Sequence, residues 1–92
     1  MQSGTNAATD RWRIVPRYFF NLYNDVTAMD PEGMELPDLA AARAEAITNI
    51  RGLLTEDVLR GRIVLRHRIE IADESQAVVD KVAYGEAVEI ER

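Results

Sequence analysis

The sequence predicts an α+β domain of ββαββ order, in which a four-stranded antiparallel sheet packs one face against one amphipathic helix. Three observations lead to this prediction. Residues 17–23 alternate as a strand does, residues 39–60 repeat apolar side chains with a helical period, and residues 63–90 return to strand-like alternation around a polar turn. The chain has 92 residues, 47% of them hydrophobic, which is enough for one domain with a modest core.

The first predicted strand is the aromatic segment RYFFNLY, residues 17–23. Asn24-Asp25 predicts a turn, residues 26–30 predict a return strand, and residues 30–33 have the proline and glycine of a β-turn. Side chains alternate between the faces of a strand. The expected core face therefore takes Tyr18, Phe20 and Leu22, and the opposite face takes Phe19, Asn21 and Tyr23.

The predicted helix runs from Leu39 to about Arg60, directly after the segment MELPD. Pro37 disfavours helical backbone just before it, and Asp38 is suited to accept a hydrogen bond from a backbone N–H as the N-cap. Gly61 suits the left-handed residue just past the end. At about 100° per residue, one apolar arc results. Its expected members are Leu39, Ala46, Ile47, Ile50, Leu53, Leu54 and Val58.

The second half predicts two more strands, residues 63–73 and 77–90, joined by the polar turn DESQ. The last strand is expected to bend at Gly85. Residues 1–14 are small and polar, so we expect a flexible tail, followed by a single domain over residues 15–92. The expected core face of the second half takes His67, Ile69, Ile71, Val82 and Tyr84.

Composition excludes several classes of function. The chain contains no cysteine, so disulfides, thiolate catalysis and cysteine metal sites are excluded. Its apolar runs are too short to span a membrane and its N-terminus has no secretory signal, so we expect a cytoplasmic location. A net charge of −5 makes general nucleic-acid binding unlikely. Only Ser3 and Ser75 could act as serine nucleophiles, and no phosphate loop is present, so we expect no enzyme, no catalytic residue and no cofactor.

The polar residues that invite a metal site have local explanations. His67, the single histidine, has no second histidine or cysteine to share a metal, and is expected at a strand end or on its apolar side. The acids Asp30, Glu32, Glu35 and Asp38 miss the spacing of a calcium-binding loop. We therefore expect no metal site.

Arginines offer two further hypotheses. Arg43 lies inside the apolar arc of the helix, which indicates either a contact with an anionic ligand or partner, or a stem over the core whose head pairs with Asp30, Glu32 or Glu35. The favoured interpretation is the second. A set of four arginines could also form a stripe for RNA, although the favoured interpretation is a solvated surface near the helix end. Its members are Arg60, Arg62, Arg66 and Arg68, of which Arg66 and Arg68 are expected on the open face of the sheet.

Four stretches together suggest a family: PRYFF (16–20), DPEGMELPDLAAARAEA (30–46), RIEIADE (68–74) and GEAVEI (85–90). Across Val15 to Ile90 the chain resembles short bacterial proteins grouped as domain of unknown function 6894. That resemblance implies no catalytic residue. Members often begin at Met-Pro-Arg-Tyr, where this chain has Val15, so residues 1–14 have the alternative interpretation of a mis-assigned start. A glycine is common in the last hairpin of the family, where this chain has Ser75-Gln76. A looser resemblance, of fold alone, links the chain to HicB-type antitoxins.

The predicted function is that of a small protein-interaction module, most simply a homodimer joined through its sheet. One helix covers only one face, so the other face exposes an apolar patch that monomers rarely leave open. The alternatives are an antitoxin-like or regulatory protein that binds a protein partner through the same sheet, and a weak RNA-contacting protein. The expected interface residues are Phe19, Tyr23, Val79 and Ala83.

Overall fold

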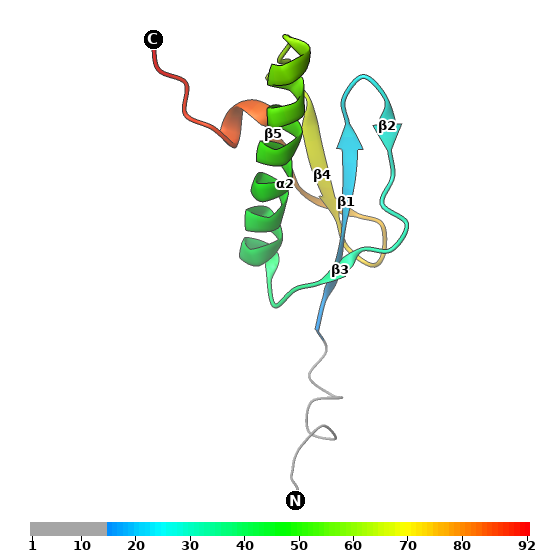
Figure 1. The fold of residues 1–92 in the computed structure, drawn as a ribbon. Coiled ribbons are helices and arrows are strands. Elements are labelled where there is room, and N and C mark those ends of the chain that lie inside the picture. Colours follow the sequence, from blue (N-terminus) through cyan, green and yellow to red (C-terminus); the bar gives the residue numbers. More distant parts are fainter. Residues whose placement is uncertain (1–14) are drawn as a thin grey trace, which may run out of the picture.

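The computed structural model describes residues 15–92, and within them one α-helix lies against an antiparallel sheet (Figure 1). The predicted α+β fold is confirmed, with one additional short strand before the helix. The predicted tail, residues 1–14, lies outside the described residues. The elements are β1 (Arg17–Tyr23), β2 (Thr27–Ala28), β3 (Met34–Glu35), α2 (Leu39–Arg60), β4 (Arg68–Ala72), β5 (Val78–Ala83) and the 3-10 helix η1 (Tyr84–Glu86).

Strand β1 lies inside the sheet, with β4 along one side and the short strands β2 and β3 along the other. Strand β5 follows β4 and forms the far edge. The register places Phe20 opposite Ile71 and Leu22 opposite Ile69. Because side chains alternate along each strand, these residues share the face toward the helix. The predicted core face is confirmed by the cluster of Tyr18, Ile69, Ile71, Val82 and Tyr84, against which Phe20 and Leu22 pack.

The predicted return strand over residues 26–30 is wrong in its extent. Only β2 lies within that range, and β3 begins later, at Met34. Between the two short strands, Asp30 supplies the hydrogen bonds to β1. One carboxylate oxygen accepts the Phe20 N–H at 3.1 Å, the other accepts the Gly33 N–H at 3.1 Å, and the Asp30 N–H donates to Asn21 Oδ1 at 2.9 Å. Pro31 cannot donate to a ladder, so a side-chain acceptor in the preceding residue keeps the polar groups of β1 satisfied at the break.

The second hairpin is shorter than predicted at both ends. Its first strand begins at Arg68 rather than near Ile63, and its second ends at Ala83, where η1 begins. The pairing nevertheless continues irregularly, because the Tyr84 N–H donates to the His67 carbonyl at 2.7 Å. The predicted polar turn is confirmed: the Asp73 carboxylate accepts from backbone N–H groups of the turn, and the expected bend near Gly85 is the turn of η1.

The predicted helix bounds are confirmed at both ends. Asp38 Oδ1 accepts the Ala41 N–H at 2.8 Å, and Gly61 is left-handed with φ of 82°. The buried line is narrower than predicted, since Leu39 and Val58 are exposed while Ala42 is fully buried. Small side chains at one-turn spacing let the helix approach the sheet closely along that line. The buried residues of α2 are Ala42, Ala46, Ile50 and Leu54.

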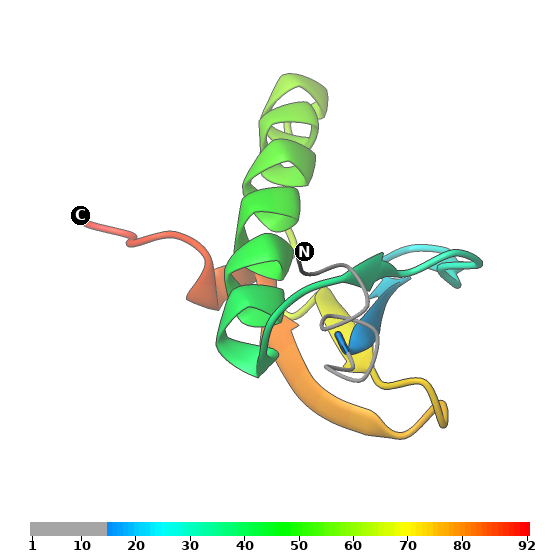
Figure 2. The same cartoon turned by 90° about the horizontal axis from the view of Figure 1, so that it is seen from below.

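Helix α2 packs chiefly on β4, β5 and η1, so it lies over one half of the sheet rather than over its middle (Figure 2). Arg51 reinforces this placement, because its Nε donates to the Ala87 carbonyl at 2.7 Å. Two consequences follow for function. The core side of β1 is only partly covered, and the helix side chains reach the outer edge of β5.

Candidate interaction surface

The face of the sheet opposite α2 has no helix packed on it in the described part of the chain. This face includes all four predicted interface residues. Tyr23, Arg68 and Ala83 lie side by side across three strands. Two rows further along the same face, Phe19 lies opposite Ala72. The structure therefore brings the predicted residues of β1 and β5 onto one surface, which we call the open face: Phe19, Tyr23, Arg68, Glu70, Val78, Val79, Lys81 and Ala83.

A bulge in β5 adds Val78 to this surface, which the sequence did not predict. Ile71 pairs with Asp80 but Ala72 pairs with Val78, so Val79 is an extra residue on β5. Simple alternation places Val79 outward and Val78 inward, whereas the bulge leaves both exposed, at 48% for Val78 and 39% for Val79. The sequence around residue 79 has no glycine or turn motif from which the bulge could have been predicted.

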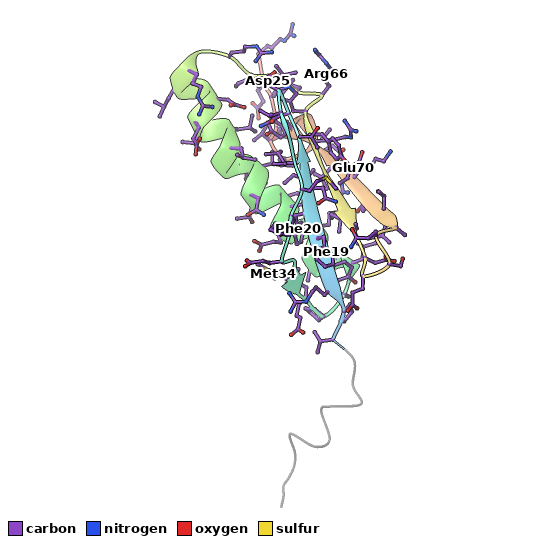
Figure 3. The ribbon with its side chains drawn as sticks, turned by 90° about the vertical axis from the view of Figure 1, so that its right-hand side faces the viewer. Phe19, Phe20, Asp25, Met34, Arg66 and Glu70 are labelled. Carbon is purple, nitrogen blue, oxygen red and sulfur yellow. The ribbon has the colours of Figure 1, made fainter. Side chains whose placement is uncertain are left out.

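The open face has an ordered polar centre. The Arg68 Nε donates to Glu70 Oε2 at 2.6 Å, and the guanidinium carbon lies 4.5 Å from the centre of the Tyr23 ring. Glu70 points out from the sheet (Figure 3) yet is only 8% exposed as a residue. The cation over the aromatic ring is also bonded to a carboxylate, and these two contacts together order the Tyr23 side chain.

The four arginines of the predicted stripe are not gathered into one basic surface. Arg62 contacts Asp25 at 2.8 Å, and Arg60 lies 3.4 Å from both Glu56 and Asp57. Arg66 lies at the turn before β4, at the end of the molecule that also holds Asp25 (Figure 3). The expected position of Arg66 on the sheet face is therefore wrong, because β4 begins only at Arg68.

Electrostatic effects at that end of the molecule are local. The hydrogen bond from Arg62 lowers the pKa of Asp25 below its ordinary value, against a smaller opposing effect of desolvation. His67 is 13% exposed at its side chain and meets the Tyr84 ring edge-on, with 5.5 Å between ring centres. Burial raises the pKa of Tyr84. His67 thus lies at a strand end against an aromatic ring, as its sequence position suggested.

The acids before the helix have structural partners. Asp30 spans the break in the sheet and Asp38 caps α2, while Glu35 lies 3.4 Å from Arg17. Burial alone would raise the pKa of Asp30, but N–H donors from Gly33, Phe20 and Glu32 together hold it below its ordinary value. Within residues 15–92, no group of three histidine, aspartate or glutamate side chains is placed to hold a metal ion.

Arg43 corrects a prediction, because it does not pair with Asp30, Glu32 or Glu35. Its two terminal nitrogens donate to Asp80 Oδ2 at 3.0 Å and to Glu86 Oε1 at 2.7 Å. The second oxygen of each carboxylate accepts a backbone N–H of β5: Asp80 Oδ1 that of Lys81 at 2.8 Å, and Glu86 Oε2 that of Ala83 at 2.9 Å. We call Arg43, Asp80 and Glu86 the edge clamp.

The edge clamp is strongly charge-assisted. The Ala83 N–H and then the Arg43 guanidinium lower the pKa of Glu86, while the hydrogen bonds that Arg43 donates to Glu86 and Asp80 raise the pKa of Arg43. A helical wheel cannot predict this pairing, since it shows that Arg43 lies near the core but not which strand it meets. The partners come from the far end of the chain, and the lateral placement of α2 decides the contact.

Two hollows border the helix. A groove of about 490 Å³ separates α2 from β1 and is lined by Phe20, Leu22 and Leu53 among others. A more apolar hollow of about 430 Å³ lies at the helix C-terminus, between Leu54, Ile63 and Ile90. Val58 lines this second hollow and is exposed, although the sequence predicted it for the core.

Comparison with known proteins adds one match. Residues 17–85 match the model of a family described as Domain of unknown function (DUF6894), a span that includes the whole sheet and α2. No curated protein and no solved structure matches the chain, so neither comparison supports the resemblance to HicB-type antitoxins. In the described part of the chain, no helix is both long and apolar enough to cross a membrane.

Proposed function

Because the chain belongs to the family described as Domain of unknown function (DUF6894), we propose a role from its own surfaces: a small non-enzymatic interaction module that forms a homodimer through its open face. The observation behind this proposal is the uncovered sheet face on which Tyr23 is held by Arg68, with Phe19, Val78 and Val79 beside it. A second copy of the chain would remove these apolar side chains from water.

The structure of the two sheet edges favours a dimer contact through the open face rather than through an edge. At one edge, the N–H groups of Lys81 and Ala83 are bonded to the carboxylates of the edge clamp. At the other edge, β2 and β3 have only two residues each, and Asp30-Pro31 separates them. Short or blocked edges are poor templates for another strand. A two-fold contact between two open faces has no such obstacle.

The composition of the open face also suits recognition between proteins. Tyrosine and arginine are enriched where interfaces gain most of their binding energy, and a side chain that is already ordered loses less entropy on binding. Glu70 is bonded to Arg68 and nearly buried in the single chain. Burying the face therefore does not leave that carboxylate without a partner.

We also propose that the chain is not an enzyme. This proposal is supported by the local uses of the polar residues that could do chemistry. His67 lies against the Tyr84 ring, and Ser75 donates to Asp73 within a turn at 2.6 Å. Neither arrangement pairs a nucleophile with a base.

Sedimentation of the wild-type chain at micromolar concentration tests the homodimer. We expect a dimer that Tyr23→Glu converts to a monomer, because the substitution removes the aromatic ring under Arg68 and adds a charge to the contact. A matched pair of variants locates the contact: Val79→Glu on the open face is expected to weaken the dimer, whereas Val58→Glu, 60% exposed at the helix end, is not. Circular dichroism should show unchanged helix content in all three.

A monomeric wild type at these concentrations would overturn the homodimer. It would favour the alternative in which the open face is reserved for a different protein, as in an antitoxin-like or regulatory role. Co-purification with one defined small protein from the native organism, lost in Tyr23→Glu and kept in Val58→Glu, would then identify that partner. A dimer disrupted only by Val58→Glu would instead place the contact at the apolar hollow.

A further inference from the structure

The direction of the backbone groups along β5 can be deduced from one bond. The Tyr84 N–H donates to the His67 carbonyl at 2.7 Å, so residue 84 faces β4 with its polar backbone groups. These groups alternate along an antiparallel strand. The N–H groups of Val82 and Asp80 therefore also face β4, while those of Ala83 and Lys81 face the outer edge of the sheet.

The two outward donors are the ones that the edge clamp occupies. Asp80 and Glu86 each use one oxygen for a β5 N–H and the other for a terminal nitrogen of Arg43. Arg43 comes from α2 and so ties to the helix both carboxylates, which a strand at the edge would have to displace. A single guanidinium thus holds two acceptors against two neighbouring donors of the edge.

We propose that the edge clamp keeps β5 closed to a second copy of this chain, and that its removal lets two β5 strands pair antiparallel about a two-fold axis. The second copy is the occupant to expect because antiparallel pairing about such an axis makes the edge its own complement. The edge has six residues, and the exposed Val78 and Val79 would gain cover from the pairing. An uncovered edge of this kind is a template for association.

The clamp is distinct from the proposed open-face dimer, and the test separates them. The acids are removed together in Asp80→Ala/Glu86→Ala, in both the wild type and the Tyr23→Glu background, and the mass is measured by sedimentation across a concentration series. We expect the double variant to raise the mass above that of its own parent in each background. Two freed donors per chain should tighten the association by about tenfold or more.

Proline at the edge provides the decisive control. Lys81→Pro removes an outward N–H without removing a bond to β4, and proline is tolerated on edge strands for that reason. Added to the double variant, it should return the mass to that of the parent. Glu74→Ala/Glu89→Ala removes the same two negative charges from exposed positions outside the clamp and should leave the mass unchanged.

A second measurement covers the case in which the double variant does not fold. Arg43→Met keeps the apolar stem but releases both carboxylates, and we expect faster amide hydrogen exchange at Lys81 and Ala83 than at Val82, which faces β4. The proposal is overturned if a folded double variant keeps the mass of its parent, or if its extra mass survives Lys81→Pro. Unchanged exchange at Ala83 in Arg43→Met would overturn it as well.

Discussion

Gln76 and Gly33 have the same positive φ, but only one of them has a side chain. Both have φ of 71°, a region that costs most side chains about 1–2 kcal/mol and glycine almost nothing. Gly33 also has no room for a side chain, since a Cβ there would lie 2.8 Å from the Tyr18 carbonyl oxygen. The resemblance to the family pointed to a glycine in the last hairpin, and Gln76 lies where that hairpin needs one.

We therefore expect Gln76→Gly and Gly33→Ala to change the free energy of unfolding in opposite directions. Gln76→Gly should raise the free energy of unfolding by about 0.5–1 kcal/mol, since relief of the left-handed strain exceeds the added entropy of the unfolded chain. Gly33→Ala should lower it by about 2 kcal/mol or more, because contact with β1 adds to the backbone strain. Urea denaturation measures both, and equal signs for the two variants would contradict this account.

Asp30 links the fold to pH. Its folded-state pKa lies below the ordinary value, so its contribution to stability is complete above that ordinary value, near 4, and is lost as the pH falls through the lower folded value. Asp30→Asn keeps one oxygen acceptor but replaces the other with a donor facing an N–H group. We expect a loss of about 1–3 kcal/mol at neutral pH and a shallower fall in stability toward acid pH.

Denaturant titrations at a series of pH values test this expectation. Glu74→Gln, at an exposed glutamate of the second hairpin turn, provides the charge-matched control and should leave the neutral-pH stability unchanged. An acid limb of the same slope in wild type and Asp30→Asn would show that Asp30 does not titrate in the unfolding reaction.

At the scale of elements, α2 tests how far local signals determine a boundary. Asp38→Ala should cost about 1 kcal/mol because the Ala41 N–H loses its acceptor, and Asp38→Ser should recover most of that loss. Gly52→Ala should act in the opposite direction, since a Cβ there meets nothing within 4 Å and alanine is the better helix former by about 1 kcal/mol. Thermal melts with and without added calcium complete the test, and a calcium-dependent rise that Asp38→Ala removes would revive the acidic metal site.

The helix was predictable to the residue because its caps are local. Asp38 and Gly61 act on their own neighbours, so the sequence around each is sufficient. The strand ends were not predictable, because tertiary contacts decide them. Residues 63–67 alternate like a strand, but the His67 N–H donates to the Val64 carbonyl within a turn, and η1 interrupts the last predicted strand after Ala83. The bulge at Val79 likewise depends on the match between β4 and β5.

At the scale of the whole molecule, charge argues against a nucleic-acid partner. The net charge is −5, and Arg60, Arg62 and Arg68 each lie beside an acid. We therefore expect the chain to pass unretained through a nucleic-acid column at physiological salt, since few phosphate contacts would release counterions. Retention that falls steeply with salt and is lost in Arg66→Ala would support the RNA-contacting alternative.

The whole-molecule fold followed from sequence better than the surfaces did. Alternation in β1 and the period of α2 were enough for the layers and for most of the core. The positions of Phe19 and Tyr23 on the open face were predicted correctly, because they depend only on alternation within one strand. The edge clamp was not, because Arg43 meets Asp80 and Glu86 only once α2 has been placed laterally on the sheet.

Helix α2 runs along the sheet, so its length determines how β1, with β2 and β3, is aligned with the hairpin of β4 and β5. β3 leaves the sheet beside Arg17, and β4 enters it beside Tyr23, at opposite ends of β1. The 22-residue helix is what returns the chain from one end to the other. β1 and β4 can pair only when this helix closes a long loop between them, so we expect their docking to be the slow step of folding. We expect a helix shortened by one turn to misalign the pairing of β1 with β4.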